Sequence, residues 1–222
     1  VPGYSTDAVA QHTIALLLEL TNRTRALDTE LRKDRWTQHA GDCVWDAPMI
    51  ALSGKTFGVL GTGAIGSRAA EIAQALGMRV IGNSRNARTE FCGSYVSLED
   101  LFRQSDVLSL HCAATTETRG VVNRDSLAMM KPSSILINTA RGALVDSAAL
   151  AEALNTGLIY AAGLDVVDRE PILPDNPLLF AKNCLITPHV AWLPKDVRER
   201  LVDIAAENLN SFLNDGKLNR VD

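Results

Sequence analysis

The chain alternates between short apolar runs and longer segments in which apolar residues recur at helical spacing. The first segment has the helical pattern. Ser5 or Thr6 can cap it, and Asp7 favours its first turn. Apolar residues then recur along one face over residues 9–20, although the section that follows is mostly polar. This pattern predicts one long N-terminal helix over about residues 6–35.

Six later apolar runs are short enough for buried strands and are bounded by turn residues. They lie at residues 56–60, 79–82, 106–110, 134–138, 161–165 and 184–187. Helical patterns lie between or after them, at residues 64–76, from Ser97 onward, 125–130, 147–155 and 195–213. Strand and helix in alternation predict an α/β fold, a doubly wound parallel sheet with helices on both faces.

Composition narrows the class of protein without changing this picture. The 222 residues are 46% hydrophobic and 22% charged, as in an ordinary globular α/β protein. A net charge of −4 gives no electrostatic reason to expect nucleic acid or an anionic membrane as partner. The longest apolar run, Ile14–Leu18, is too short to cross a bilayer. We therefore expect neither nucleic acid nor a membrane as partner.

The cysteines are scattered, at Cys43, Cys92, Cys112 and Cys184. They form no CxxC pair, and no histidine lies at metal-ligand spacing from them. We therefore expect reduced thiols, a cytoplasmic location and no metal site.

Residues 61–66 read G-T-G-A-I-G, which fits G-x-G-x-x-G directly after a strand and at the start of a helix. Gly61 would permit a tight turn, Gly63 would let a pyrophosphate approach the backbone, and Gly66 would allow close helix–strand packing. The amides of Ala64 and Ile65 would then face the phosphates. This context predicts a Rossmann-type dinucleotide site; the alternative is a glycine-rich turn with a structural role alone.

The end of the second strand usually determines which dinucleotide binds. An acidic residue there would accept the ribose hydroxyls of NAD, but this chain has Ser84 in that place. Arg85 follows directly and Arg88 lies close by, and guanidinium groups bind the 2′-phosphate of NADP. We therefore expect NADP(H) to be favoured, with NAD(H) possible. The alternative is that both arginines are solvated loop charges.

Three polar residues follow strands late in the chain: Arg141, Glu170 and His189. Because the carboxyl ends of parallel strands share one edge of the sheet with the glycine turn, these side chains should converge there. Each has an ordinary explanation alone, as a surface ion pair or a turn residue. Together they form a candidate acid–base site, for which His12, His39 and His111 are weaker candidates.

These segments resemble the D-isomer-specific 2-hydroxyacid dehydrogenase family. The resemblance covers almost the whole chain and includes Met130-Lys131-Pro132, residues 136–142 and Asp175-Asn176-Pro177-Leu178. Within the family, Ala191-Trp192 and the opening Val1-Pro2-Gly3-Tyr4 are most similar to the glycerate dehydrogenase, or hydroxypyruvate reductase, branch. The resemblance implies hydride transfer between NAD(P)H and a small 2-keto acid, hydroxypyruvate or glyoxylate, with D-glycerate as a corresponding 2-hydroxy acid.

The resemblance also implies roles for individual residues. Arg141 would bind the substrate carboxylate and carbonyl oxygen, and His189 would protonate that oxygen. Glu170 would orient the imidazole and favour its charged form. Further contacts to the cofactor are expected from Thr139, Ala140 and Asp165. Formate dehydrogenases typically have Gln in place of Glu170, which argues against formate as substrate.

Two alternatives to an active enzyme remain open. One is a nucleotide-sensing binding protein similar to the corepressors related to this family, and the other is a catalytically dead cofactor-domain fragment. The resemblance assigns residues 5–190 to the dinucleotide-binding domain and residues 193–222 to a remnant of a flavodoxin-like substrate domain whose N-terminal half is missing. This chain alone is therefore expected to be poorly active. A homodimer formed through the cofactor domain is also expected.

Overall fold

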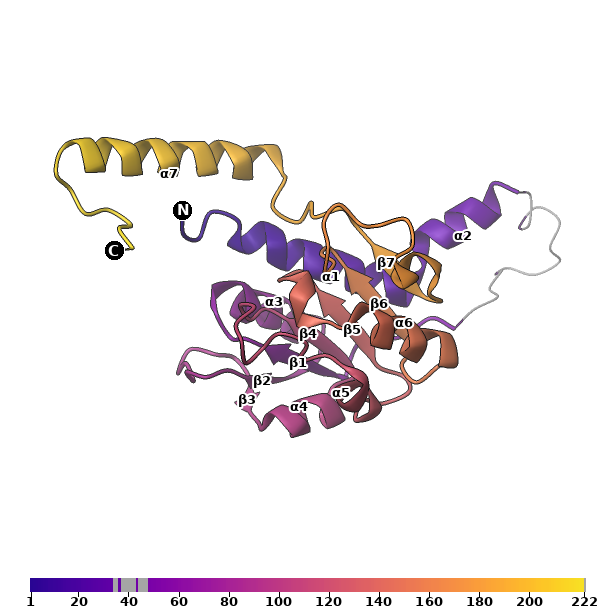
Figure 1. Cartoon of the computed structure of the whole chain (residues 1–222). Helices are drawn as coiled ribbons and strands as arrows, with labels where there is room; N and C mark the ends of the chain where they lie inside the picture. The colour runs from indigo at the N-terminus through magenta and orange to yellow at the C-terminus, as the bar shows by residue number, and fades with distance from the viewer. Residues whose placement is uncertain (34–35, 37–42, 44–47, 222) are drawn as a thin grey trace.

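The computed structural model describes residues 1–33, 36, 43 and 48–221. Within these residues, seven parallel strands form one sheet in the order β3-β2-β1-β4-β5-β6-β7 (Figure 1). The strands are β1 (Thr56–Leu60), β2 (Arg79–Asn83), β3 (Ser94–Tyr95), β4 (Val107–Leu110), β5 (Ile135–Asn138), β6 (Ala161–Leu164) and β7 (Cys184–Ile186). The strand order reverses between β1 and β4, which makes this the topological switch point. The predicted doubly wound α/β sheet is confirmed.

Helices cover both faces of the sheet. One face packs against α1 and α3, and the other packs against α4, α5 and α6. The helices and 3₁₀ turns are α1 (Thr6–Asn22), α2 (Thr24–Leu31), α3 (Ala64–Ala75), α4 (Leu98–Gln104), α5 (Arg124–Ala128), η1 (Gly142–Leu144), α6 (Ser147–Thr156), η2 (Pro177–Phe180) and α7 (Lys195–Leu213). No helix of the described residues is long and apolar enough to cross a membrane.

The central strand β5 shows how the apolar runs build two cores. Ile135 and Ile137 lie in the cluster that contains Leu17 of α1. Leu136, which lies between them, belongs to the opposite cluster with Leu150 of α6. Side chains alternate between the faces of a strand, so a continuous apolar run is required where both faces are covered.

The predicted single helix over residues 6–35 is wrong, because it is two helices. Arg23 has the left-handed conformation (φ 54°, ψ 34°) and ends α1, with its amide donating to the carbonyl of Glu19. The Glu19 carboxylate also accepts hydrogen bonds from the hydroxyl of Thr24 (2.7 Å) and the amide of Arg25 (3.2 Å). α2 buries no residue, so no apolar face holds it on the axis of α1. Residues 34–35 lie outside the described residues.

The short strand β3 was not expected from the sequence. It contains only Ser94 and Tyr95, which pair with Ile81 and Gly82 of β2. Two residues carry no detectable period-2 pattern, and their place at the edge of the sheet comes from pairing with a neighbour that is distant in sequence.

α7 (yellow in Figure 1) extends away from the sheet layers, close to the N-terminus. Arg200 donates a hydrogen bond to the carbonyl oxygen of Tyr4 (3.2 Å). Val197 is the residue of α7 that is buried, whereas Leu209 and Phe212 are 58% and 69% exposed. The division of the chain at residues 190–193 into two domains stays a prediction.

The Asp106→Asn substitution tests the hydrogen bonds that join the start of β1 to Lys131 through the carboxylate of Asp106. The Asp106 carboxylate accepts hydrogen bonds from the amide of Thr56 (2.7 Å) and the ammonium of Lys131 (2.8 Å). Burial alone would raise the pKa of Asp106, but these two hydrogen bonds lower it overall. Its stabilisation is therefore present above the unfolded pKa of about 4 and is lost as the pH falls through the lower folded value.

We expect this variant to lose roughly 1–3 kcal/mol of unfolding free energy at pH 7. The difference from wild type should shrink below about pH 4, as measured by urea unfolding at both pH values. Asp28→Asn, in an exposed ion pair with Arg32, is the control and should unfold like wild type. An equal loss for Asp106→Asn at both pH values would contradict the charge-based account.

Candidate active site

The glycine turn lies between β1 and α3, at the switch point of the sheet. Gly61 has φ +98°, and a Cβ there would lie 2.5 Å from the amide nitrogen of Cys112. A Cβ on Gly66 would lie 2.1 Å from the carbonyl oxygen of Gly61, so the helix could not approach the turn so closely. Gly63 differs, because a Cβ there would have no protein atom within 4 Å. Packing within the protein therefore does not require glycine at position 63. A side chain there would instead project into open space next to the turn.

The surroundings of Gly63 fit a pyrophosphate. Gly63 is the N-cap residue of α3, and the amide of Ser67 donates to its carbonyl oxygen (2.9 Å). The amides of Ala64 and Ile65, in the first turn, precede that first helical bond and have no partner within the helix. Free amides and the positive end of the helix dipole favour a bound anion, and Ile65 lines the cleft described below.

A buried amide shapes the turn that carries Arg141. The side chain of Asn138, fully buried at the end of β5, accepts a hydrogen bond from the amide of Ala140 (3.0 Å) and donates to the carbonyl oxygen of Arg141 (2.9 Å). Next to it, the hydroxyl of Thr139 pairs with the hydroxyl of Thr13 on α1 (2.8 Å). The Arg141 guanidinium donates to the carbonyl oxygen of Ala140 (2.6 Å) and is exposed at the rim of the cleft.

Gly142 joins this turn to the loop after β6. A Cβ on Gly142 would lie 1.9 Å from the carbonyl carbon and oxygen of Val167. The amide of Val167 in turn donates to the carboxylate of Glu170 (3.2 Å). The Arg141 and Glu170 loops therefore touch backbone to backbone, with no room for a side chain between them.

Glu170 and His189 form a direct pair. One carboxylate oxygen of Glu170 lies 2.6 Å from Nδ1 of His189. Because Nδ1 is engaged by the carboxylate, Nε2 is the nitrogen that can exchange a proton with a substrate.

His189 has the left-handed conformation (φ 55°), and Asp165 holds the turn around it. The carbonyl oxygen of Asp165 accepts from the amide of His189 (2.8 Å), and its carboxylate accepts from the amides of Val190 (3.0 Å) and Ala191 (2.9 Å). Burial alone would raise the pKa of Asp165, but hydrogen bonds from His12, from Thr187 and from these amides lower it overall. Asp165 is 1% exposed, and both of its carboxylate oxygens already accept protein hydrogen bonds. Its expected contact with the cofactor stays a prediction.

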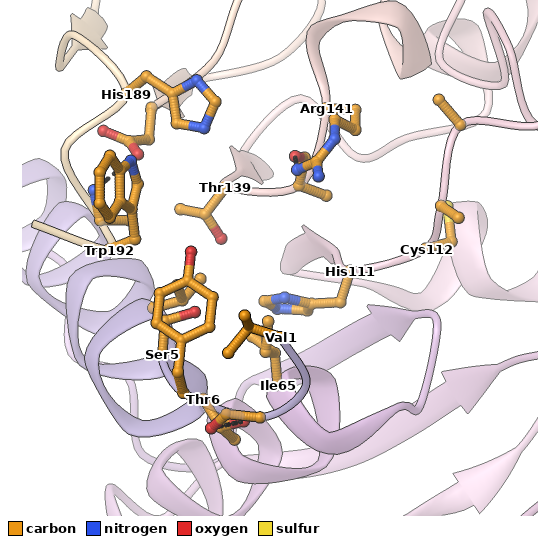
Figure 2. Close-up of a pocket in the computed structure, with 18 residues that line it drawn as sticks. Val1, Ser5, Thr6, Ile65, His111, Cys112, Thr139, Arg141, His189 and Trp192 are labelled. Carbon is orange, nitrogen blue, oxygen red and sulfur yellow. Dashed lines mark hydrogen bonds between the residues drawn. The ribbon is translucent and has the colours of Figure 1, made fainter. Parts of the chain in front are cut away.

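A cleft of about 610 Å³ brings several of the predicted residues together, but Glu170, Ala64 and the three glycines of the turn are not among its lining residues. Figure 2 shows His189 and Arg141 on opposite sides of it, with Thr139 between them and His111 below. Its lining includes residues of the N-terminal segment, the first turn of α3, the ends of β4 to β6 and the His189 loop. Those that sequence analysis had singled out are Ile65, His111, Thr139, Ala140, Arg141, Asp165, His189, Ala191 and Trp192.

The remaining histidines differ in their surroundings. Burial lowers the pKa of His111 to about 4, so its ring is neutral near pH 7, and Nε2 pairs with the hydroxyl of Ser109 (2.8 Å). His12 of α1 lies against Thr187, a contact that no sequence pattern revealed because the two residues are 175 positions apart. His39 lies outside the described residues. No group of three or more His, Cys, Asp or Glu in the described part could hold a metal ion.

Ser84 follows β2, and Arg85 and Arg88 are exposed in the loop beyond it. The amide of Arg88 donates to the hydroxyl of Tyr95 (2.8 Å), which also pairs with the hydroxyl of Thr62 in the glycine turn (2.9 Å). Tyr95, which sequence analysis did not identify, therefore joins this loop to the candidate phosphate site.

Arg85 lies close enough to Glu117 to influence its charge. The pKa of Glu117 is lowered chiefly by a hydrogen bond from Thr115, and in smaller part by the positive charge of Arg85. A phosphate bound at Arg85 would therefore lie near the carboxylate of Glu117 as well as near the guanidinium.

The fold and the cleft together define a dinucleotide-binding domain with an acid–base pair at its edge. Comparison with known proteins identifies the family. Residues 14–191 match the family described as "D-isomer specific 2-hydroxyacid dehydrogenase, NAD binding domain". The chain is 45% identical to a hydroxypyruvate reductase of Blautia hydrogenotrophica, over 100% of this chain and 70% of that protein. It is 44% identical to a glyoxylate reductase of Aeropyrum pernix, over 95% of this chain and 64% of that protein.

Solved structures agree with this similarity. An NADPH-dependent glyoxylate/hydroxypyruvate reductase from Sinorhizobium meliloti, in complex with NADP and malonate, has a TM-score of 0.87 at 32% identity. The match covers 96% of this chain and 66% of that one. An NAD-complexed D-isomer specific 2-hydroxyacid dehydrogenase from Lactobacillus delbrueckii has a TM-score of 0.85 at 29% identity, over 100% of this chain and 71% of that one.

This chain belongs to the D-isomer specific 2-hydroxyacid dehydrogenase family and contains its NAD-binding domain. It is therefore an oxidoreductase chain with a nicotinamide dinucleotide as cofactor, as the fold and the glycine turn predicted. The chain spans 64% to 70% of the length of the two curated relatives named above. The corepressor-like alternative is not favoured, because these relatives are named as reductases.

The Gly63→Ala and Gly66→Ala substitutions separate cofactor binding from folding. Gly63→Ala adds a methyl group that meets no protein atom, so the unfolding free energy should change by no more than about 1 kcal/mol. The same methyl group intrudes on a bound pyrophosphate, so the Kd for NADPH or NADH should rise about tenfold or more. Gly66→Ala should instead destabilise the fold, by roughly 1–3 kcal/mol.

Urea unfolding and quenching of the chain's tryptophan fluorescence by dinucleotide measure the two effects. Unchanged dinucleotide affinity in Gly63→Ala would show that the cofactor does not approach this turn.

Proposed function

We propose that this chain provides the cofactor domain and the acid–base residues of a reductase that converts glyoxylate or hydroxypyruvate to the corresponding 2-hydroxy acid, with NADPH as the favoured reductant. The observation that carries the proposal is the pair of His189 and Glu170, 2.6 Å apart, with His189 on the opposite side of one cleft from Arg141. An acid–base group and a fixed guanidinium across an open cleft suit a small substrate that carries a carboxylate next to a carbonyl.

The names of similar proteins support this substrate class. Relatives at 45% and 44% identity are named hydroxypyruvate reductase and glyoxylate reductase, and one at 37% identity is named glycerate dehydrogenase. These three names describe small 2-keto acids and one of their reduction products. The extent of the match supports the same substrate class here.

The residues of the chain divide the reaction between them. Arg141 binds the substrate carboxylate and polarises the adjacent carbonyl through its planar set of N–H donors. A reduced nicotinamide, when bound, supplies the hydride for the carbonyl carbon. His189 delivers a proton from Nε2 to the carbonyl oxygen, so that one hydride and one proton convert the keto group to a hydroxyl group. Glu170 keeps the imidazole oriented and stabilises its charge before the proton leaves.

In this proposal the glycine turn and the Arg141 turn position the cofactor. Gly63, Ala64 and Ile65 would hold the pyrophosphate, and Thr139 and Ala140, which line the cleft, would contact the cofactor. Ser84 and the two exposed arginines, Arg85 and Arg88, favour the 2′-phosphate of NADP, since no carboxylate occupies the Ser84 position.

Three further expectations of the sequence analysis have no test in the structure. They are the homodimer, the cytoplasmic location and poor activity of this chain alone. Each stays a prediction.

Substitution of His189 by Gln removes the proton donor while keeping a polar side chain of similar length. Reduction of hydroxypyruvate, followed by loss of NADPH absorbance, should slow by about 10²–10⁴ in kcat, with dinucleotide affinity unchanged. Glu170→Gln replaces the carboxylate that holds Nδ1 of His189, so reduction should slow while dinucleotide affinity stays unchanged. Full activity of the His189→Gln variant would disprove the assigned role.

Substitution of Ser84 by Asp places a carboxylate where the 2′-phosphate of NADP would lie. Repulsion should raise the Kd for NADPH at least tenfold, and the Kd for NADH should change little. Arg85→Ala should raise the Kd for NADPH in the same selective way. Arg103→Ala, on the exposed surface of α4, serves as the control. Equal effects on both dinucleotides would mean that this loop does not discriminate between them.

A further inference from the structure

Two consecutive residues of α1, His12 and Thr13, each contact one of the two loops that border the cleft. Nε2 of His12 lies 2.9 Å from the hydroxyl of Thr187, at the start of the His189 loop. The hydroxyl of Thr13 lies 2.8 Å from that of Thr139, in the Arg141 turn. These residues are separated by 175 and 126 positions in the chain, so the contacts arise only where α1 crosses the sheet.

The hydrogen bonds from His12 have a defined direction. The lowered pKa of Asp165 keeps its carboxylate ionised near pH 7, so it can only accept hydrogen bonds. The hydroxyl of Thr187, 2.5 Å from this carboxylate, must therefore donate its proton to Asp165. That hydroxyl can then only accept from His12, whose Nε2 must carry a hydrogen. His12 of α1 thus donates to Thr187, and Thr187 donates to the Asp165 carboxylate, which accepts from the two amides after His189.

The same reasoning sets the direction at Thr13. Its hydroxyl donates to the carbonyl oxygen of Val9 (2.9 Å), so it accepts from the hydroxyl of Thr139. Thr139 therefore turns its only hydroxyl proton toward α1 and can offer only an acceptor to a molecule in the cleft. Thr13 is fully buried, whereas the side chain of His12 is 22% exposed.

We infer that His12 and Thr13 are positioning residues, with His12 holding the His189 loop and Thr13 holding the Arg141 turn. The catalytic part of this inference rests on the proposed function, but the anchoring part does not. α1 is a long helix packed against α3 and the sheet, so it offers a rigid base for both loops. Rigid support of this kind keeps catalytic groups within the small tolerance that efficient reaction requires.

Amide hydrogen exchange of the ¹⁵N-labelled chain tests the anchoring without any cofactor. His12→Leu should speed exchange of the amides of Val190 and Ala191 about tenfold, because their acceptor Asp165 loses the support of the donor chain. Thr13→Val, which keeps the side-chain shape, should speed exchange of the Ala140 amide by a similar factor. Each variant should leave the amides of the other loop unchanged.

Conservative variants and a control separate anchoring from general destabilisation. His12→Gln retains an N–H donor, Thr13→Ser retains the hydroxyl, and both should restore most of the protection. Gln11→Leu, at an exposed neighbouring position on α1, should change none of these amides. Unchanged exchange in the two loops, or equal acceleration across β1 and β4 as well, would overturn the inference.

Kinetics then connect the anchors to catalysis. His12→Leu should lower kcat for keto-acid reduction about tenfold and leave the Kd for NADPH unchanged, with recovery in His12→Gln. Thr13→Val should raise KM for the keto acid more than it lowers kcat, because it loosens the Arg141 turn. If the variants speed amide exchange in their own loops but leave kcat and KM unchanged, the catalytic part of the inference is refuted. A wild-type chain that binds neither NADPH nor NADH would refute the proposed function, and the exchange data would still decide the anchoring.

Discussion

The buried carboxylate of Asp165 is the interaction on which the site depends most. It follows β6, where a charge would be unfavourable without donors, and three groups supply them: the hydroxyl of Thr187 and the amides of Val190 and Ala191. His12, which donates to Thr187, also lies 3.4 Å from the carboxylate. Satisfying this single charge bends the chain after β7 into a tight turn. That turn puts His189 in the left-handed conformation and directs its ring toward Glu170.

The parallel sheet explains why residues so distant in sequence meet. Asn138, Asp165 and Thr187 follow three neighbouring strands, β5, β6 and β7, and so lie along one edge. Asn138 holds the turn that leaves β5, and Asp165 holds the loop that leaves β7, through hydrogen bonds to backbone groups. Thr187 supports Asp165 by donating to its carboxylate. The catalytic side chains themselves make few such bonds. The hydrogen bonds at the strand ends therefore hold the backbones of the loops in place. The side chains of Arg141 and His189 remain exposed to the cleft.

The elements that could be predicted from the sequence are those with a local signal. Apolar runs located six of the seven strands within a residue or two, and the glycine pattern located the turn before α3. The pairing of His189 with Glu170 followed from the order of strands and the family resemblance. The break at Arg23 was missed because a left-handed residue other than glycine leaves no mark in a hydrophobic pattern. The contacts of His12, Thr13 and Tyr95 with Thr187, Thr139 and Thr62 were missed because these partners are distant in sequence.

The site also shows how hydroxyl groups set the direction of hydrogen bonds around the buried charge. Thr187, Thr13 and Tyr95 each have two hydrogen-bond partners, and each can donate only one proton. Once a hydroxyl gives its proton to one neighbour, its role toward the other is fixed as acceptor. In this way the hydrogen bonds between α1 and the loops of the cleft have a fixed donor and a fixed acceptor, and these hydroxyl groups add no charge to the cleft. In the proposed reaction, the groups whose charge acts on the substrate are Arg141, His189 and Glu170.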